Sequence, residues 1–586
     1  MNDGAQLAER RSFLEQGPID RRAESRTPSP PAWVVVGGVC ALALVTMHPW
    51  VPAWGGDAVI HLRIAELFAQ GRPFEYNPGE PVGASTSLLW TLLLAGFFRV
   101  LDPAAVAWAV KVVCFAAWYG TAVAMAACWS RLYGDRAAGL LAASAYALSP
   151  GIFRNATGGM EASFFALQLV LLFAVVFVPR GEGAPALASG APREGSPTHT
   201  ASPTRSERGL LAAAFALSAT ATLTRPEGLI FVTLLAGYLA VRDRGRPRLA
   251  LGILAGAAVG VAGTVLANLY ATGSPIPDSA VARLATGLRA SVRIGPLHAD
   301  LRSVVLLLGY LPFTLGLVFG LSRRLASAGG GDRAGAVREG DAGPTREGDA
   351  RPAPEPWRAP VEFTLVLTAA LLVFYTFVAG AAHASRYWLP FYPFVFGAGS
   401  GTLVLVFRRL RREGWSRTAV PGAVACLLWL AAFYAADAYR RRGAPIGHPH
   451  GQVAAAVRER PAFTERYLRE LGVTAADPRP VSVAVTEVQV RYFLADDGSV
   501  RILSLDGRTG ADFGRYLDPE TGLRRFDLYL REVRPDFVEL GQFDPAEPVL
   551  PAVLEAWERG EERITVDGFE FRRTGIPYVV RFVHEP

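Results

Sequence analysis

Two adjacent stretches decide the fold class of this chain. Residues Trp33 to Val51 read WVVVGGVCALALVTMHPWV, and residues Trp54 to Pro81 read WGGDAVIHLRIAELFAQGRPFEYNPGEP. The first stretch is an uncharged apolar run within the ~17–25 residues that a membrane-spanning helix needs. The second stretch places acids, arginines and a histidine directly after it. This loop is therefore predicted to lie at the edge of a bilayer, where ionisable residues are often functional.

The composition extends this prediction to the whole chain. The 586 residues are 51% hydrophobic and only 19% charged, whereas soluble domains average roughly 25% charged residues. Apolar runs of spanning length recur along the sequence, so we expect a polytopic membrane protein rather than a large soluble one. The net charge of +7 is modest. Basic and aromatic residues do not interleave as they do in proteins that bind nucleic acid.

The cysteines add no chemistry to this prediction. All four lie in apolar segments, and none has the CxxC or zinc-ligand spacing that would indicate a metal site or a redox pair. We interpret them as small buried hydrophobic residues. They are Cys40, Cys114, Cys128 and Cys426.

The positions of the arginines predict the topology. Five arginines fall in residues 1–32, and the links 179–208, 242–248, 323–358 and 408–417 are also marked by arginine. The positive-inside rule places all five segments in the cytoplasm. Counting between them gives about eleven transmembrane helices. Only two of the three segments near 86–101, 104–129 and 137–149 can then cross completely.

The chain is predicted to have three parts. Residues 1–32 form a disordered cytoplasmic tail, residues 33–438 a helical membrane domain, and residues 439–586 a soluble α/β domain that parity places outside. Within the membrane domain, the links 179–208 and 323–358 are rich in Gly, Pro, Ala and charge, so we expect them to be disordered and cytoplasmic.

The soluble part follows an α/β pattern. VSVAVTEVQVRYFLADDGSVRILSLDG predicts a strand, a short helix and a strand, and FDLYLREVRPDFVELG predicts a helix followed by a strand. ITVDGFEFRR and YVVRFV predict two further strands.

This topology gathers polar residues on the outer face. Each of them lies at the edge of an apolar segment, where charges are costly and often functional. They come from the first loop, from NATGGMEASFF, from LTRPEGLIF, from GSPIPDSAVAR and from HASRYWLPFYP. The residues are Asp57, His61, Glu161, Arg225, Glu227, Asp278, His383, Arg386 and Tyr387.

The acids have structural interpretations as well. Asp57 precedes a run with helical apolar spacing and also fits an N-cap. His61 follows one helical turn later and is within reach of Asp57. Glu161 fits the cap of the next apolar helix. NPGE, beginning at Asn77, is predicted to form a turn, with its proline fixing φ and its glycine free to adopt positive φ.

The basic residues have structural interpretations of the same kind. Arg225 and Arg386 fit interfacial arginines whose stems lie along apolar surface. Glu227 fits a local ion pair with Arg225. RYWLP, which begins at Arg386, also fits an interfacial aromatic belt. Each residue taken alone leaves a functional and a structural interpretation open, whereas their order along the chain is more specific.

In that order, the motifs resemble those of the GT-C glycosyltransferases, polytopic enzymes that take a sugar from a polyprenyl-phosphate carrier on the outer face of the membrane. The nearest branches are the protein-mannosyltransferases, the aminoarabinose transferases and the actinobacterial terminal arabinofuranosyltransferases. The resemblance covers most of residues 33–586 outside the two low-complexity links. It is carried by GDAVIHLRIAE, NPGEPVGASTSLLW, GGMEASFFAL, LTRPEGLIF, GSPIPDS and RYWLPFYP, and by the C-terminal VAVTE, ILSLDG and LREVRPDFVEL.

The resemblance implies an inverting transfer of a sugar to an acceptor hydroxyl of a glycan, lipid or protein. Asp57 would be the catalytic base, with Glu161 as a second catalytic acid that orients the acceptor or assists a metal. The donor phosphate would be bound by Arg386, Arg225 and His383. Substrate contacts would come from His61, Glu227, Asp278 and Tyr387.

The cellular place and the cofactor follow from the same resemblance. The protein would be a multi-pass protein of the cytoplasmic (inner) membrane with its site on the external or periplasmic face. Family members often carry two acids in the first loop, whereas here the first of these positions is Gly56. That departure weakens the expectation of a divalent cation without removing it.

Three other functions stay open at this point. A transporter or flippase of lipid-linked glycans would place charges in mid-span and show internal repeats, which this sequence lacks. A lipid-linked glycan polymerase or ligase would use the same donors for a different reaction. A protein that binds glycolipid without catalysis is supported by Gly56.

Overall fold

The structure is a computed structural model of the chain. It describes residues 30–83, 87–178, 205–243, 245–277, 313, 356–377, 388–412, 416–442, 450–474, 476–478, 480–485, 488–505, 516, 518, 523–540 and 546–583. Residues 1–29 of the predicted tail (1–32) and most of the two predicted loops lie outside these ranges.

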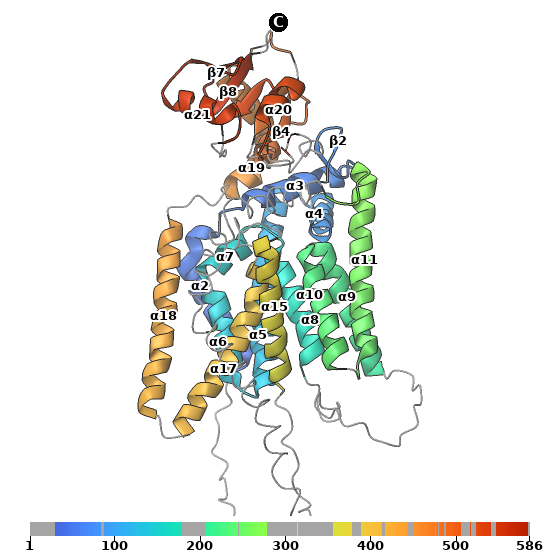
Figure 1. The fold of residues 1–586 in the computed structure, drawn as a ribbon, viewed down its shortest axis with the longest axis vertical. Coiled ribbons are helices and arrows are strands. Elements are labelled where there is room, and N and C mark those ends of the chain that lie inside the picture. The colour runs from blue at the N-terminus through green and yellow to red at the C-terminus, as the bar shows by residue number, and fades with distance from the viewer. Residues whose placement is uncertain are drawn as a thin grey trace, which may run out of the picture.

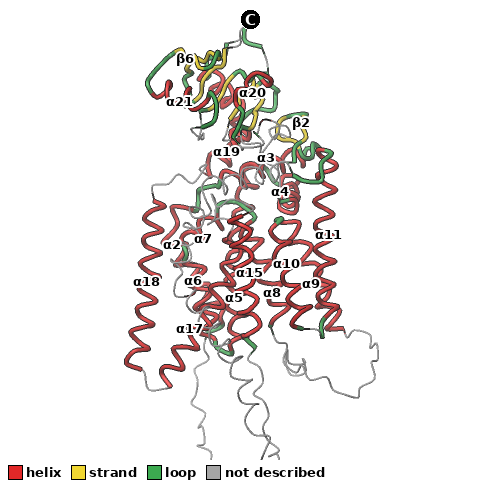
Figure 2. Tube along the Cα trace, viewed as in Figure 1, coloured by secondary structure: helices red, strands yellow, loops and turns green. Residues whose placement is uncertain are grey.

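The larger part of the molecule is a bundle of helices (Figures 1 and 2). Its first half contains α2 (Ala32–Met47), η1 (His48–Trp50), α3 (Gly56–Ala69), α4 (Leu88–Val100), α5 (Pro103–Tyr133), α6 (Arg136–Leu148), α7 (Pro150–Thr157) and α8 (Ala162–Phe177). Its second half contains α9 (Arg205–Thr224), α10 (Glu227–Arg242), α11 (Pro247–Thr272), α15 (Arg358–Phe377), η3 (Leu389–Phe391), α17 (Tyr392–Arg412) and α18 (Ser416–Arg442).

These helices have the character of a multi-pass membrane protein. Among the described residues, six are long and apolar enough to cross a membrane, and the pair α7 and α8, bent by 109°, would make a seventh. Their outward faces carry large apolar side chains, including Leu251 and Leu266 on α11 and Leu428 on α18. Such surfaces are unfavourable in water and favourable against lipid. The predicted total of about eleven spans is therefore not confirmed for the described residues.

The helix positions agree closely with the apolar segments of the sequence. One of the three early segments was expected not to cross. Figure 1 places α4 beside α3, at the end of the bundle that carries the C-terminal sheet, and its 13 residues extend only about 20 Å. α6, another of these three segments, also has 13 residues. Two boundaries differ: α9 begins at Arg205, inside the predicted loop, and α18 continues past residue 439 to Arg442.

The two ends of the bundle differ in charge. The ends of α10, α11 and α17 that carry Arg242, Arg246 and Arg408 lie away from the C-terminal sheet (Figure 1). At this end Arg408 pairs with Asp135, which caps α6, at 2.8 Å. The opposite end is covered by α3, which lies across the bundle rather than along it (Figure 1).

The C-terminal domain, described here from residue 450 to 583, is an α/β unit. It contains α19 (His450–Glu470), β3 (Val481–Val485), η4 (Val488–Phe493), β4 (Val500–Ser504), α20 (Phe526–Val533), β5 (Phe537–Glu539), α21 (Leu550–Glu558), β6 (Arg563–Val566), β7 (Phe569–Arg573) and β8 (Val579–Val583). The strand order is β4-β3-β5-β8-β7-β6, with β3 parallel to β4 and β5 and the remaining pairs antiparallel. The predicted strand–helix–strand pattern is present.

The prediction of a single strand for ITVDGFEFRR was wrong. ITVDGFEFRR forms two strands, β6 and β7, joined at Asp567 and Gly568, both of which have positive φ. An Asp-Gly pair between apolar alternations is a strong hairpin signal, because a two-residue turn of this type requires positive φ at both positions. The sequence therefore contained the signal that separates the two strands.

Candidate active site

The site begins at α3, the helix that lies across the end of the bundle. The helix starts at Gly56 with Gly55 in the N-cap position and no side-chain cap. Asp57 is therefore in the first turn and is half-buried. The interpretation of Asp57 as the N-cap was wrong, although an acid in the first turn is still favoured by the helix dipole. His61 lies one turn further on the same helix face and is buried.

Glu161 lies opposite this face, at the start of α8. It occupies the N-cap position, but its side chain makes no capping hydrogen bond. The carboxylate instead faces Arg225, with Oε1 3.1 Å from the guanidinium, and His61, whose Nε2 is 3.6 Å from Oε2. Glu161 is only 3% exposed. Its side chain therefore serves tertiary contacts rather than the helix end.

Arg225 joins the link between α9 and α10 to this carboxylate. It is 5% exposed and also contacts Glu227 through two hydrogen bonds of 3.1 and 3.3 Å. The predicted pairing of Arg225 with Glu227 is thus present. We call His61, Glu161, Arg225 and Glu227 the Glu161 cluster. Its members come from three segments that are remote in sequence.

One oxygen of the cluster is incompletely satisfied. Among the described residues, Oε2 of Glu161 is buried and has no hydrogen-bond partner, because His61 Nε2 at 3.6 Å is too distant to donate one. Buried polar atoms in native proteins are nearly always hydrogen-bonded, so such an exception needs an explanation. An oxygen of this kind is suited to accept a hydrogen bond from a ligand.

A lysine inside the bundle fixes the geometry of the cluster. Lys111 is the only lysine of the chain and is buried on α5. Its ammonium donates hydrogen bonds to the carbonyl oxygens of Ala53 and Thr157, and it lies 4.8 Å from the ring centre of Trp54. Lys111 therefore ties the segment before α3 to the turn before Glu161.

That turn is held closely against the same segment. The N–H of Gly55 donates to the carbonyl of Gly158 at 2.8 Å. Gly159 has φ of +81°, and a Cβ there would lie 2.4 Å from the ring of Trp54. Only glycine fits this position, because a side chain would meet both the strained backbone and the indole. The sequence prediction did not include Lys111, Trp54 or Gly159, although a single lysine within an apolar helix was a usable signal.

Four predicted residues lie outside the described part of the chain. The structure describes α11 and the link as far as Pro277, and after α15 the described chain resumes at Trp388. Trp388 is buried with its ring 5.7 Å from that of Tyr375. Of the predicted residues, the structure thus brings together His61, Glu161, Arg225 and Glu227, with Asp57 one turn away. Those outside are Asp278, His383, Arg386 and Tyr387.

The described residues do not form a metal site. They contain no group of three or more His, Cys, Asp or Glu side chains arranged to hold an ion. In the Glu161 cluster, the guanidinium of Arg225 contacts both Glu161 and Glu227 and supplies the positive charge between these carboxylates. We therefore derive no step that uses a divalent cation.

Comparisons with known proteins gave a structural likeness only. No family model matches the chain, and no curated protein matches it in sequence. The archaeal oligosaccharyltransferase AglB from Archaeoglobus fulgidus, solved with an inhibitory peptide and a dolichol-phosphate, is similar with a TM-score of 0.49 and 12% identity over 90% of this chain and 71% of that one. The apo form of the Archaeoglobus fulgidus oligosaccharyltransferase has a TM-score of 0.47 and 13% identity, over 88% and 70% of the two chains.

Proposed function

We propose that this chain is a membrane glycosyltransferase of the GT-C type, which moves a sugar from a polyprenyl-phosphate donor to an acceptor hydroxyl. The observation that carries the proposal is the Glu161 cluster beside Asp57. Buried ionisable groups from three remote segments meet at one end of a bundle of apolar helices. A donor with a lipid tail and a phosphate headgroup needs its site at such a place, because the tail stays in the bilayer.

The orientation of the site is part of this proposal. The arginine-bearing ends of α10, α11 and α17 lie away from α3. With those ends in the cytoplasm, as the positive-inside rule favours, α3 and the C-terminal domain are on the outer face. Donor and acceptor then meet on the external side of a cytoplasmic membrane. The acceptor would be a hydroxyl of an envelope glycan, a lipid or a protein.

In the proposed reaction, the acceptor oxygen attacks the anomeric carbon of the sugar. The bond between that carbon and the phosphate oxygen breaks, and polyprenyl phosphate leaves with the bonding electron pair. The carboxylate of Asp57 takes the proton from the attacking hydroxyl, which is the task of a general base. Direct displacement of this kind inverts the anomeric centre.

The other residues bind and orient the substrates. Oε2 of Glu161 accepts a hydrogen bond from an acceptor or sugar hydroxyl, while Arg225 and His61 hold the carboxylate in place. The leaving phosphate is stabilised by arginine, whose planar guanidinium matches its oxygens. We assign this task to Arg386, Arg225 and His383, and the remaining substrate contacts to His61, Glu227, Asp278 and Tyr387.

The test is a transfer assay in membranes with a panel of radiolabelled polyprenyl-phosphate sugars. Wild-type protein is expected to transfer label, and Asp57→Asn to lower the rate by about 10²–10⁴. Asp243→Asn is the matched control, because Asp243 pairs with Arg246 at the opposite end of the bundle. Equal transfer by Asp57→Asn and wild type would remove Asp57 as the base. Movement of donor lipid across the membrane without transfer would favour a flippase.

A further inference from the structure

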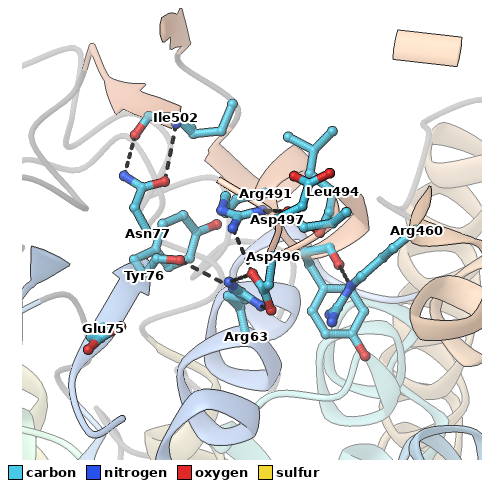
Figure 3. A network of polar contacts seen from close by, with 12 residues as sticks. Arg63, Glu75, Tyr76, Asn77, Arg460, Arg491, Leu494, Asp496, Asp497 and Ile502 are labelled. Carbon is cyan, nitrogen blue, oxygen red and sulfur yellow. Dashed lines mark hydrogen bonds and ion pairs between the residues drawn. The ribbon is translucent and has the colours of Figure 1, made fainter. Parts of the chain in front are cut away.

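The C-terminal domain contacts α3 through a second set of charges, part of which Figure 3 shows. Its arginines and Glu66 are buried, whereas Asp496 is exposed. Arg63 is fully buried and donates Nε–H to the carbonyl of Tyr76 at 3.2 Å. Both terminal nitrogens of Arg63 donate to the carboxylate of Asp496, one of them at 2.9 Å. Arg491 donates to the same carboxylate at 2.7 Å. One aspartate of the C-terminal domain thus binds two buried arginines.

A second ion pair lies one helical turn along α3. Glu66 accepts two hydrogen bonds from Arg460 of α19, at 2.9 and 2.6 Å. Arg460 also donates Nε–H to the carbonyl of Tyr492 at 2.7 Å. We call Arg63, Glu66, Arg460, Arg491 and Asp496 the Asp496 cluster. It fixes α3 against α19 and the segment around η4.

The loop after α3 extends this docking to the sheet. β1 (Glu75–Asn77) and β2 (Glu80–Pro81) form a hairpin whose turn contains Gly79 with φ of +79°, as the NPGE motif predicted. The amide of Asn77 donates to the carbonyl of Ile502 at 2.8 Å and accepts from its N–H at 3.1 Å (Figure 3). Polar contacts therefore join the C-terminal domain both to α3 and to the loop that follows it.

The positions of these residues around the axis of α3 connect the docking of the C-terminal domain to the candidate active site. At about 100° per residue, Glu66 lies about 180° and Arg63 about 120° around the helix from Asp57. His61, about 40° around the helix from Asp57, contacts Glu161, whereas Arg63 and Glu66 lie on the other side and bind Asp496 and Arg460. If the contacts of Arg63 and Glu66 were lost and α3 rotated about its axis, Asp57 and His61 would therefore be displaced as well.

The choice of charged residues also needs a reason. Replacing a buried ion pair with well-packed apolar residues is often neutral or stabilising. Stability alone therefore gives little reason for an Asp496 cluster at this interface. Paired, planar guanidinium–carboxylate contacts are directional, however, and set both the position and the rotation of the helix that carries them.

We propose that Arg63, Glu66, Arg460 and Asp496 are positioning residues of the active site. The C-terminal domain holds α3 in the rotation that presents Asp57 and His61 to Glu161 and Arg225. The assignment to catalysis rests on the proposed function, whereas the effect on α3 itself does not. The C-terminal domain thus contributes to catalysis by holding α3 in position.

The experiment uses full-length protein purified in detergent and compares Asp496→Asn with Asp527→Asn. Asp527 belongs to the same domain and pairs with Arg525 in an exposed contact away from α3, so it controls for loss of an aspartate. Hydrogen exchange of the α3 amides and steady-state transfer kinetics are measured for both. Asp496→Glu, which keeps the charge, is the rescue variant.

We expect faster amide exchange over residues 57–69 in Asp496→Asn alone. We also expect its kcat to fall about 10- to 100-fold, the scale of a small misplacement of catalytic groups, with KM for the donor changed less than twofold. Asp496→Glu should restore part of kcat. Unchanged exchange in α3, or a change that Asp527→Asn shares, would overturn the proposal.

The two readouts separate this proposal from the proposed function. If wild-type protein transfers no sugar from any donor while α3 is loosened in Asp496→Asn only, the function fails and the control of α3 by the C-terminal domain stands. If transfer is seen and Asp496→Asn has the kcat of wild type, the function stands and positioning by Asp496 is rejected. A parallel loss of kcat and of folded protein without rescue by Asp496→Glu would identify a merely structural role.

Discussion

The Glu161 cluster and the Asp496 cluster lie on opposite sides of α3 and are built differently. Both combine acids with arginines, and the arginines of both are buried, whereas Asp496 itself is exposed. In the Asp496 cluster, Arg63 and Arg460 each bind a carboxylate through two hydrogen bonds. In the Glu161 cluster, Arg225 binds Glu227 in the same way, but Glu161 lies 3.1 Å from Arg225 and 3.6 Å from His61, and one of its oxygens has no hydrogen-bond partner among the described residues.

This difference separates a cluster that holds the protein together from one that is prepared for a ligand. Both carboxylates of the Asp496 cluster accept hydrogen bonds on each oxygen, although Nε of Arg491 lacks a partner among the described residues. A carboxylate satisfied in this way rigidifies the parts that it joins, whereas an unsatisfied buried oxygen lowers stability until something binds to it. Stability and activity should therefore respond in opposite ways to substitutions on the two sides of α3.

The largest effect is expected on the side of the C-terminal domain. Arg460→Met leaves the carboxylate of Glu66 buried without its main partner, and breaking a buried pair in this way costs about 3–5 kcal/mol. The thermal unfolding midpoint of the purified protein should fall accordingly. Adding Glu66→Leu removes the stranded charge and should restore most of the loss. A double variant no more stable than Arg460→Met would show that the pair does not act as a unit.

A large effect on activity, without loss of stability, is expected on the other side. Glu161→Gln keeps the shape of the side chain but removes the charge that orients and accepts hydrogen bonds, so transfer should fall on the order of 100-fold. The unfolding midpoint should stay the same or rise, because active-site charges are often held at a cost in stability. Assays of rate and midpoint on one preparation decide this. A stability loss as large as that of Arg460→Met would remove the contrast.

A smaller effect is expected at Lys111. Lys111→Met leaves the carbonyls of Ala53 and Thr157 without their donor, which should cost about 2 kcal/mol. Transfer should fall about tenfold, since the start of α3 and the turn before Glu161 are no longer tied together. Trp108→Leu on the outer face of the same helix is the control. Equal values for both variants would show that Lys111 has no positioning role.

The smallest effect concerns pH. Burial alone would raise the pKa of Asp496, but Arg63, assisted by Arg491 and Arg460, lowers it below its ordinary value of 3.8. A lowered pKa in the folded state means that the stabilisation is complete above pH 3.8 and is lost as the pH falls through the folded pKa. The difference in unfolding midpoint between wild type and Asp496→Asn should therefore be constant from pH 7 to about pH 5. It should shrink below pH 4, and a difference independent of pH down to pH 2 would contradict this.

Much of the fold could be predicted because it depends on local pattern. The apolar run from Trp33 predicted a helix, and the arginines of residues 408–412 predicted the end of another. The structure has α2 and the end of α17 at these places. The NPGE turn and the strand–helix–strand segment also depend on neighbours in the sequence. The hairpin at Asp567 was missed although its signal was local.

The contacts of the site could be predicted only in part, because they are tertiary. Asp57, Glu161 and Arg225 stood out as costly charges at the ends of apolar segments. Nothing in the sequence pairs Arg63 with Asp496, however, since 433 residues separate them. The sequence shows that Lys111 is the only lysine, but its two partners are backbone carbonyls. Every residue has such a group, so the sequence does not indicate which ones Lys111 binds.

The separation of Arg63 from Asp496 also has a consequence for biosynthesis. The first loop enters its compartment early, yet the carboxylate that neutralises Arg63 is made 433 residues later. At the roughly 5–20 residues per second of protein synthesis, that interval is roughly 20–90 s. Until residue 460 is made, α3 has neither Asp496 nor Arg460 to bind, so a nascent chain released before that point exposes an arginine and a glutamate that the mature protein buries. Completion of the active site is thereby tied to completion of the chain.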